Sequence, residues 1–254
     1  MHQSVLDRFV GFSVKFEGSV SSLYLDIKGL ATVGVGCLCD PVSLALLLPW
    51  LMPDGSPASH EEIEKQWNVV KTQGNPRLHW KYSAGLSTMR LTDAGVLQVA
   101  DDRLKANEVI LRRYFPHWDD LPADAQLCCC SMAWAVGAGF PAIFTNFTRL
   151  LNAGDYAGAI QACGIKTEGN PGIIPRNAAN RLCLANAARS VKMGYPKEQL
   201  FWPGVPAEAE GADLSLKAQA ELALAEHPPH FGWDSAGKDV AAWSEDDEDT
   251  KPAV

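Results

Sequence analysis

The sequence predicts an α+β fold that is mostly helical, and two patterns support this prediction. Apolar residues recur at intervals of three and four along much of the 254-residue chain, as amphipathic helices require. Two short alternating runs, Leu23–Asp26 and Ala31–Val35, flank Lys28-Gly29 and predict a small β-hairpin. The composition, 47% hydrophobic and 20% charged, is that of a globular protein with room for a sizeable core.

The first predicted helix leads directly into this hairpin. Its apolar stripe advances in steps of four, three and four, at Val5, Phe9, Phe12 and Phe16. Gly18 suits a helix exit, which places Glu17 in or beside the last turn. A carboxylate there meets the negative end of the helix dipole, which favours its protonated form. A sequence shaped by stability alone would more often carry Lys or Arg at this position, so Glu17 hints at function.

Further helices are predicted by caps and breakers. Ser59 and Glu62 form a capping-box pattern, which predicts a helix over 59–71. The nearby aromatic residues Trp67, Trp80 and Tyr82 are interpreted as core residues, and the alternative is that they line a groove. The other predicted helices are a long one from an N-cap at Thr92 to about Tyr114, one opened by Pro122 with a stripe of Leu127, Cys130 and Trp134, and four over 140–151, 155–163, 175–191 and 214–226.

Charge is unevenly distributed along the chain. The net charge is −8, yet residues 1–195 carry 18 Lys and Arg against 17 Asp and Glu, whereas residues 196–254 carry 4 against 13. The acidic run 244–250 is typical of a solvated tail. Because there is neither a basic patch nor a recognition motif, no nucleic-acid partner is expected. The apolar runs are too short to predict a membrane span.

The cysteines and the N-terminal segment bear on where the protein works. Seven cysteines, an odd number, argue against a disulfide framework, and Cys128-Cys129-Cys130 are interpreted as buried thiols. Neither a CxxC pair nor an HExxH motif occurs, so a zinc site is not expected. The N-terminal segment lacks the basic-then-apolar pattern of a signal peptide, which predicts synthesis in the cytoplasm and export by another route.

Glu17, Asp26 and Thr32 have the chemistry that cleavage of a glycosidic bond requires. That reaction needs one protonated carboxyl, which donates a proton to the leaving oxygen, and one ionised carboxylate, which activates water or attacks the sugar. Glu17 at a helix end is the candidate acid, and Asp26 in the polar surroundings of the hairpin is the candidate base. The hydroxyl of Thr32 is suited to hold the attacking water. On spacing alone, ordinary surface acids beside a hairpin remain the alternative.

The motif around these residues resembles the phage-type lysozymes of glycoside hydrolase family 24, the group containing the T-even phage endolysin. In that family a glutamate ends the first helix and is followed by Tyr-x-Asp and Thr-x-Gly-x-Gly, which appear here as Phe16-Glu17-Gly18, Tyr24-Leu25-Asp26 and Thr32-Val33-Gly34-Val35-Gly36. Further blocks resemble the family in the same order, and the resemblance covers about residues 5–190. They are Leu91-Thr92, the segment from Ser131 to Phe140, the segment from Leu150 to Ala159, and the segment from Gly172 to Asn180.

The resemblance implies a fold and a set of roles. The fold would be lysozyme-like, with a small α/β lobe carrying the hairpin sheet and an all-helical lobe, joined by a long helix. The activity would be that of a muramidase, with Glu17, Asp26 and Thr32 catalytic and without a metal or cofactor. Arg176 occupies a position that pairs with the catalytic glutamate in the family, and Trp134 is either a sugar platform or a core residue.

This sequence departs from the family pattern at positions around the presumed cleft. Cys37 replaces the usual His, Ala135 replaces an Asn or Gln, and Asn177 and Asn180 replace an Arg and a Glu. These changes motivate one alternative, a catalytically weakened module of the same fold that binds the wall or another partner. A lytic transglycosylase is a further alternative, although it would not need Asp26 and Thr32.

The predicted organisation and setting follow from the resemblance. Residues 1–195 would form the lysozyme-like domain with 38–90 as an enlarged insert, 196–243 a C-terminal extension and 244–254 a disordered acidic tail. The substrate would be peptidoglycan in the periplasm, reached either after holin release of an endolysin or by injection of an antibacterial toxin through a contractile, type VI secretion system. The toxin setting, slightly favoured by the insert and the tail, implies an immunity protein or a secretion-system component as partner.

Overall fold

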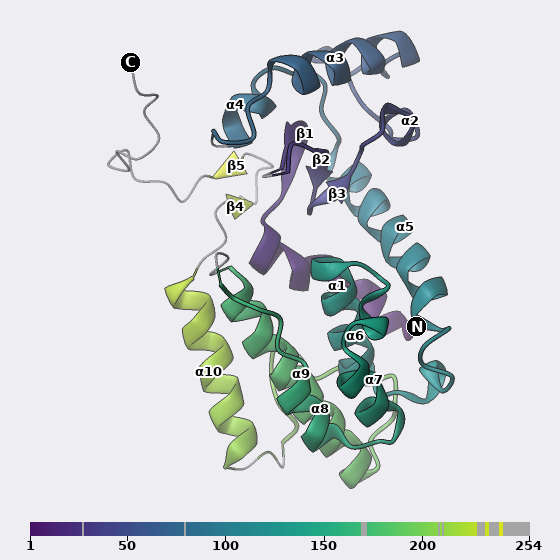
Figure 1. Ribbon diagram of the computed structural model, residues 1–254, viewed down its shortest axis with the longest axis vertical. Coiled ribbons are helices and arrows are strands. Elements are labelled where there is room, and N and C mark those ends of the chain that lie inside the picture. Colours follow the sequence, from purple (N-terminus) through teal and green to yellow (C-terminus); the bar gives the residue numbers. More distant parts are fainter. Residues whose placement is uncertain are drawn as a thin grey trace. The chain divides into compact units, whose positions relative to one another are not determined.

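A computed structural model describes residues 1–26, 28–78, 80–168, 172–207, 209 and 211–227, and the backbone alone of 232–233 and 239–240. The described chain is mostly helical with a small antiparallel sheet, which confirms the predicted α+β class (Figure 1). It divides into two compact units. The helical unit comprises Met1–Phe16 and Arg103–Pro228, and the sheet unit comprises Glu17–Asp102 and Pro229–Val254. The boundary therefore cuts through the predicted 1–195 domain, and the predicted tail 244–254 lies outside the described residues.

The sheet unit is built on the predicted hairpin. Strands β1 (Val20–Leu25) and β2 (Ala31–Gly34) pair antiparallel, with Tyr24 opposite Thr32, and β3 (Cys37–Leu38) adds to β2. Around them the unit contains three helices, α2 (Val42–Ala45), α3 (His60–Gln73) and α4 (Trp80–Ala84), and the first half of α5 (Asp93–Leu111). The hydroxyl of Ser59 accepts the Glu62 N–H and that of Thr92 accepts the Gly95 N–H, which confirms both predicted N-caps.

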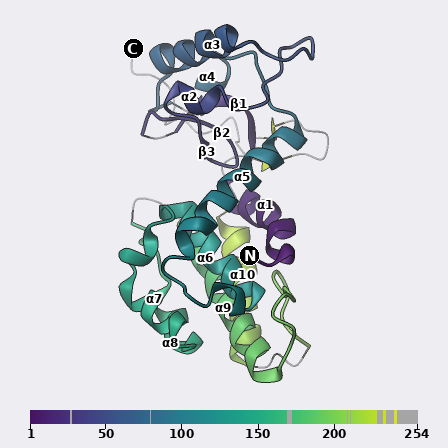
Figure 2. The same cartoon turned by 90° about the vertical axis from the view of Figure 1, so that its right-hand side faces the viewer.

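The helical unit is organised around two helices, α6 (Ala123–Val136) and α9 (Ile173–Met193). Helix α9 packs against α6, α8 (Tyr156–Ala162) and α10 (Ala212–Glu226). The unit also contains α1 (Gln3–Glu17) up to Phe16, the end of α5, α7 (Thr145–Asn152), and the short 3-10 turns η1 (Trp118–Asp120) and η2 (Phe140–Ala142). Helix α5 is the predicted long connecting helix, because it begins in the sheet unit and ends in the helical unit (Figure 2).

Three local predictions need correction. The predicted apolar stripe of α6 is wrong as a stripe, since every residue from Ala123 to Trp134 is buried and the helix is covered on all sides. The single helix predicted over 140–151 is two elements, because Phe144 leaves helical geometry with a ψ of 54° between η2 and α7. Trp80 is buried as predicted, but Tyr82 is 48% exposed and does not belong to the core.

The segment that follows residue 196 is packed into the helical unit. The buried carboxylate of Asp124 accepts the backbone N–H groups of Phe201 and Trp202 at 2.9 and 3.0 Å. Further along, Arg189 on α9 forms an ion pair of 2.6 Å with Asp213 at the start of α10. Residues 196–228 of the predicted C-terminal extension are therefore part of the helical unit.

All seven cysteines are buried thiols, which confirms the prediction for Cys128, Cys129 and Cys130 and extends it to the other four. Cys37 and Cys39 belong to the sheet unit and the other five to the helical unit. Burial raises the pKa of Cys163 to about 11 and raises the pKa of Cys128, Cys129 and Cys183 well above the ordinary value for a thiol. These thiols therefore behave as small apolar side chains in the folded protein.

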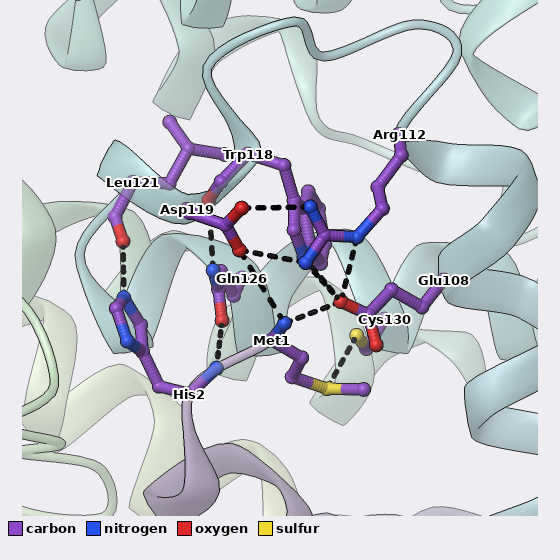
Figure 3. A network of polar contacts seen from close by, with 9 residues as sticks. All are labelled: Met1, His2, Glu108, Arg112, Trp118, Asp119, Leu121, Gln126 and Cys130. Carbon is purple, nitrogen blue, oxygen red and sulfur yellow. Dashed lines mark hydrogen bonds and ion pairs between the residues drawn. The ribbon is translucent and has the colours of Figure 1, made fainter.

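A charged cluster connects α1 to the end of α5 in the helical unit (Figure 3). The Met1 ammonium forms an ion pair with Glu108. Arg112 lies 2.8 Å from Glu108 and binds Asp119 through two parallel hydrogen bonds of 2.6 and 2.8 Å. The indole N–H of Trp118 donates to Glu108 at 3.0 Å. Glu108 therefore accepts from two cations and one indole, and it is the centre of the cluster.

Replacing this central carboxylate should destabilise the helical unit. We expect Glu108→Gln to lower the free energy of unfolding by about 2 kcal/mol at pH 7, because two cations lose their shared partner. Burial alone would raise the pKa of Glu108, but its bonds to the Met1 ammonium and Arg112 lower it overall, so this stabilisation is lost as the pH falls through the pKa of the folded protein. Urea denaturation at pH 7 and at a series of lower pH values measures both effects.

The matched control for this prediction is Glu221→Gln on α10. Its carboxylate is exposed and lies 3.7 Å from Lys217, a surface pair that contributes little. Equal losses in the two variants, or a Glu108→Gln loss that does not shrink as the pH falls below the ordinary carboxyl value of 4.5, would contradict the assignment of Glu108 as the centre of the cluster.

Candidate active site

Glu17 is the last residue of α1 and begins the sheet unit. Gly18 follows it with a φ of 65°, a left-handed conformation that ends the helix and that glycine adopts without a steric penalty. The Glu17 side chain is half-buried. The structure therefore places Glu17 at the end of the helix, as its sequence position predicted.

Asp26 lies directly after β1 and its side chain organises the hairpin turn. Its Oδ1 accepts the backbone N–H of Lys28 at 2.9 Å and that of Leu30 at 2.8 Å. The backbone of Asp26 is also bonded within the turn, donating to the Leu30 carbonyl and accepting from Gly29, both at 2.9 Å. Oδ1 is therefore the oxygen that builds the turn, and Oδ2 has no hydrogen-bond partner among the described residues.

Thr32 lies in β2, opposite Tyr24 on β1 and Leu38 on β3. Its hydroxyl donates to the carbonyl of Leu30 at 3.0 Å, the same residue whose N–H is bound by Asp26. Asp26 and Thr32 are therefore fixed on the two polar groups of one residue. Because the hydroxyl proton is already used, Thr32 offers a water molecule its oxygen lone pairs, and a water held there donates to it.

Tyr24 is the residue at this site that sequence reasoning treated only as part of a motif. The ring is buried and packs edge-on against Trp80, with 6.2 Å between the centroids. Burial first, and then the charges of Glu17 and Asp26, raise the pKa of the phenol far above its usual range. Glu17 and Asp26 therefore act on the same phenol, which stays protonated. The signal in the sequence was the Tyr at the head of Tyr24-Leu25-Asp26.

Arg176 and Trp134 both lie in the helical unit. Arg176 is 1% exposed; its guanidinium donates to the backbone and side-chain oxygens of Ser131 at 3.3 Å each and lies 4.8 Å from the ring centre of Phe16. Arg176 therefore holds the aromatic residue that precedes Glu17 in α1. Trp134 is 4% exposed, with the Arg103 guanidinium 4.6 Å from its ring centre, which is the environment of a core residue. Its role as a sugar platform stays a prediction.

Two departures from the family pattern have a local structural account. Asn177 binds the backbone of Ile165 in both directions, accepting its N–H at 2.9 Å and donating to its carbonyl at 2.7 Å, and so ties α9 to the segment before it. Cys37 is buried in β3 opposite Val33. Asn180 differs, since it is fully buried and neither atom of its amide has a hydrogen-bond partner among the described residues.

Within the described ranges, no group of three or more His, Cys, Asp or Glu side chains is arranged to hold a metal ion. None of the helices in those ranges is both long and apolar enough to cross a bilayer. Comparison with protein-family models and with curated proteins finds no match to this chain. The resemblance to phage-type lysozymes therefore stays a prediction from the motifs in the sequence.

Proposed function

We propose that this protein is a muramidase with a lysozyme-like fold, which hydrolyses the β-1,4 bond between N-acetylmuramic acid and N-acetylglucosamine in peptidoglycan. One observation carries the proposal: Asp26 and Thr32 are fixed on the two polar groups of Leu30, while Asp26 and Glu17 both act on the buried phenol of Tyr24. Two carboxylates and a hydroxyl are the groups that glycoside hydrolysis requires.

In the proposed reaction each residue has one task. Glu17 donates its proton to the glycosidic oxygen as the bond from that oxygen to the sugar C1 breaks. A water molecule that donates to the Thr32 oxygen attacks C1 and gives its other proton to Asp26, so that one water is consumed and both carboxyls exchange protonation states. If Asp26 instead stabilises the positive charge at C1, its ionised form is still required. Proton exchange with solvent restores the starting state.

The test is digestion of purified peptidoglycan with mass spectrometry of the products. Hydrolysis gives muropeptides with reducing ends, whereas a lytic transglycosylase gives anhydro products and a wall-binding module gives neither. NMR of the first anomer formed then separates attack by water on the opposite face from a covalent intermediate on Asp26. Binding to sacculi without any released product across the pH range would overturn the proposal in favour of the wall-binding alternative, which Cys37, Ala135 and Asn177 motivate.

Asp26 should be essential for activity but replaceable for folding. We expect Asp26→Asn to lower turnover by at least about 100-fold, because the amide lacks the negative charge, while the free energy of unfolding changes by less than about 1 kcal/mol. The amide oxygen still accepts the N–H groups of Lys28 and Leu30. Turnover and urea denaturation are measured on the same preparations.

The comparison variant for this prediction is Asp26→Ala. It removes the acceptor as well as the charge, so it should add a stability loss of about 1 kcal/mol to the same loss of turnover. An Asp26→Asn variant with near wild-type turnover would show that the carboxylate only builds the turn.

The biological setting is a second, separate part of the proposal. We favour an antibacterial toxin that acts in the periplasm of a target cell, with a phage endolysin as the alternative, because segment 38–90 contributes a helix, α3, to the sheet unit beyond what the three proposed catalytic residues need. A periplasmic protein that co-purifies with the enzyme and abolishes its activity supports the toxin. Holin and spanin genes beside the coding sequence would support the endolysin instead.

A further inference from the structure

Two side chains of the enlarged segment 38–90 also bind the hairpin turn that contains Asp26. Lys71, in the last turn of α3, donates to the carbonyl of Gly29 and to the carboxylate of Asp40, at 2.6 Å in each case. Asp40 in turn accepts the backbone N–H of Ala31 at 3.1 Å. Helix α3, which carries Lys71, packs against β1 and β2, and Figure 1 shows α3 in the same part of the fold as these strands.

These contacts complete the hydrogen bonding of three consecutive residues. Lys71 holds the carbonyl of Gly29, Asp26 and Thr32 hold the N–H and the carbonyl of Leu30, and Asp40 holds the N–H of Ala31. Gly29 has a φ of 74°, so the chain reverses at the residue whose carbonyl accepts the hydrogen bond from Lys71. Asp26 and Thr32 therefore bind the same three-residue backbone segment as Lys71 and Asp40.

The environment of Lys71 and Asp40 favours a lasting contact. Their side chains are 26% and 16% exposed, and the Lys71 ammonium lies 5.6 Å from the ring centre of Trp67. The Trp67 indole donates to the carbonyl of Cys39 at 2.8 Å, which ties α3 to the chain next to Asp40. Burial would raise the pKa of Asp40, but its hydrogen bonds to Lys71 and the Ala31 N–H lower it, so the carboxylate stays charged near neutral pH.

We propose that Lys71 and Asp40 are positioning residues for catalysis, which fix the Asp26 carboxylate relative to Thr32 through the backbone of residues 29–31. This inference rests on the proposed muramidase function. According to this inference, the enlarged segment contributes to catalysis by preventing displacement of the Asp26 carboxylate. A displacement of about 1 Å in a catalytic group lowers a rate by about 100-fold. Lys71 acts through the turn and touches neither of the proposed catalytic side chains in the described contacts.

The test compares Lys71→Met with Lys65→Met, an exposed lysine on the same helix. Methionine keeps the apolar stem against Trp67 but removes the ammonium. We expect Lys71→Met to lower kcat by about 10- to 100-fold with KM unchanged, and Lys71→Arg to restore much of the loss, whereas Lys65→Met behaves as wild type. Asp40→Asn, which keeps an acceptor for the Ala31 N–H, should lower kcat in the same direction by a smaller factor.

A second readout does not depend on activity. Amide hydrogen exchange at Leu30 and Ala31 should become at least about 10-fold faster in Lys71→Met and stay unchanged in Lys65→Met. Unchanged exchange overturns the inference whatever the enzyme does, and faster exchange with unchanged kcat overturns the positioning role. If the wild-type protein releases no product, the proposed function fails, and the exchange data still decide whether Lys71 holds the turn.

Discussion

Glu17→Gln should lower peptidoglycan hydrolysis by about 10²- to 10⁴-fold while the protein remains folded. The glutamine keeps the size and polarity of the side chain but has no proton to give to the leaving oxygen, and general acid catalysis by one residue contributes a factor of this size. Because Glu17 is a half-buried residue at a helix end, the free energy of unfolding should change by less than about 1 kcal/mol. Turbidity loss, muropeptide release and urea denaturation measure these quantities.

The matched control is Glu64→Gln, an exposed acid on α3 within the same unit. Its activity and stability should both match the wild type. A Glu17→Gln variant that keeps a tenth or more of the wild-type rate would remove Glu17 from the proposed mechanism. Loss of activity together with loss of the folded state would show a structural role instead.

Asp124 should give the protein an unusual dependence of stability on pH. Its carboxylate is fully buried in α6, where desolvation raises its pKa to about 6 despite hydrogen bonds from Phe201, Trp202 and Asn186. In the unfolded chain the ordinary value of 3.8 applies. Between these two values the folded protein binds the extra proton, so rising pH favours the unfolded state.

The size of this effect is measured against Asp124→Asn, which keeps the shape but does not titrate. The free energy of unfolding of the wild type, relative to that of the variant, should fall by about 3 kcal/mol between pH 3 and pH 7, since each unit of pKa shift corresponds to about 1.4 kcal/mol. Urea denaturation at steps of half a pH unit gives the difference curve. A flat curve, or a rise with pH, would contradict the assignment.

Asp120→Asn serves as the control of opposite sign. The hydrogen bond from Lys197 lowers the pKa of Asp120, so its contribution to stability is present above the ordinary pKa of an aspartate and is lost as the pH falls. The two variants therefore separate a buried acid that opposes folding near neutral pH from an exposed acid that supports it.

The features that could be predicted from the sequence depend on neighbours along the chain. The apolar stripe that includes Val5, Phe9 and Phe12 predicted α1, and these three side chains are fully buried in the structure. Gly18 and Gly29 marked the helix end and the turn, and both adopt positive φ. The hairpin register, with Tyr24 opposite Thr32, follows from the turn between its strands. The positions of Glu17, Asp26 and Thr32 on their elements were predictable for the same reason.

Features that depend on distant residues could not be predicted in this way. Lys71 binds a carbonyl 42 residues away, and nothing in the alternation around Gly29 indicates it. Helix α6 is buried on every side, which removes the periodicity that identifies a helix face. The burial that raises the pKa of Tyr24 depends on its contact with Trp80, which lies on α4 within the proline-rich segment 38–90. The position of that helix in the fold could not be predicted from the segment's sequence. The candidate site residues could be chosen from their residue types, whereas the distant contacts that hold them could not be predicted.

The reactivity of the buried thiols can be used to measure how each part of the folded protein opens to solvent. A thiol shielded from solvent reacts with an alkylating reagent only when the surrounding structure opens, so the rate of labelling measures that opening. Cys37 and Cys39 respond to the sheet unit, and the five thiols of the helical unit, Cys128, Cys129, Cys130, Cys163 and Cys183, respond to theirs. Peptide-resolved labelling of the wild-type chain thus reveals whether the two units open together or one at a time.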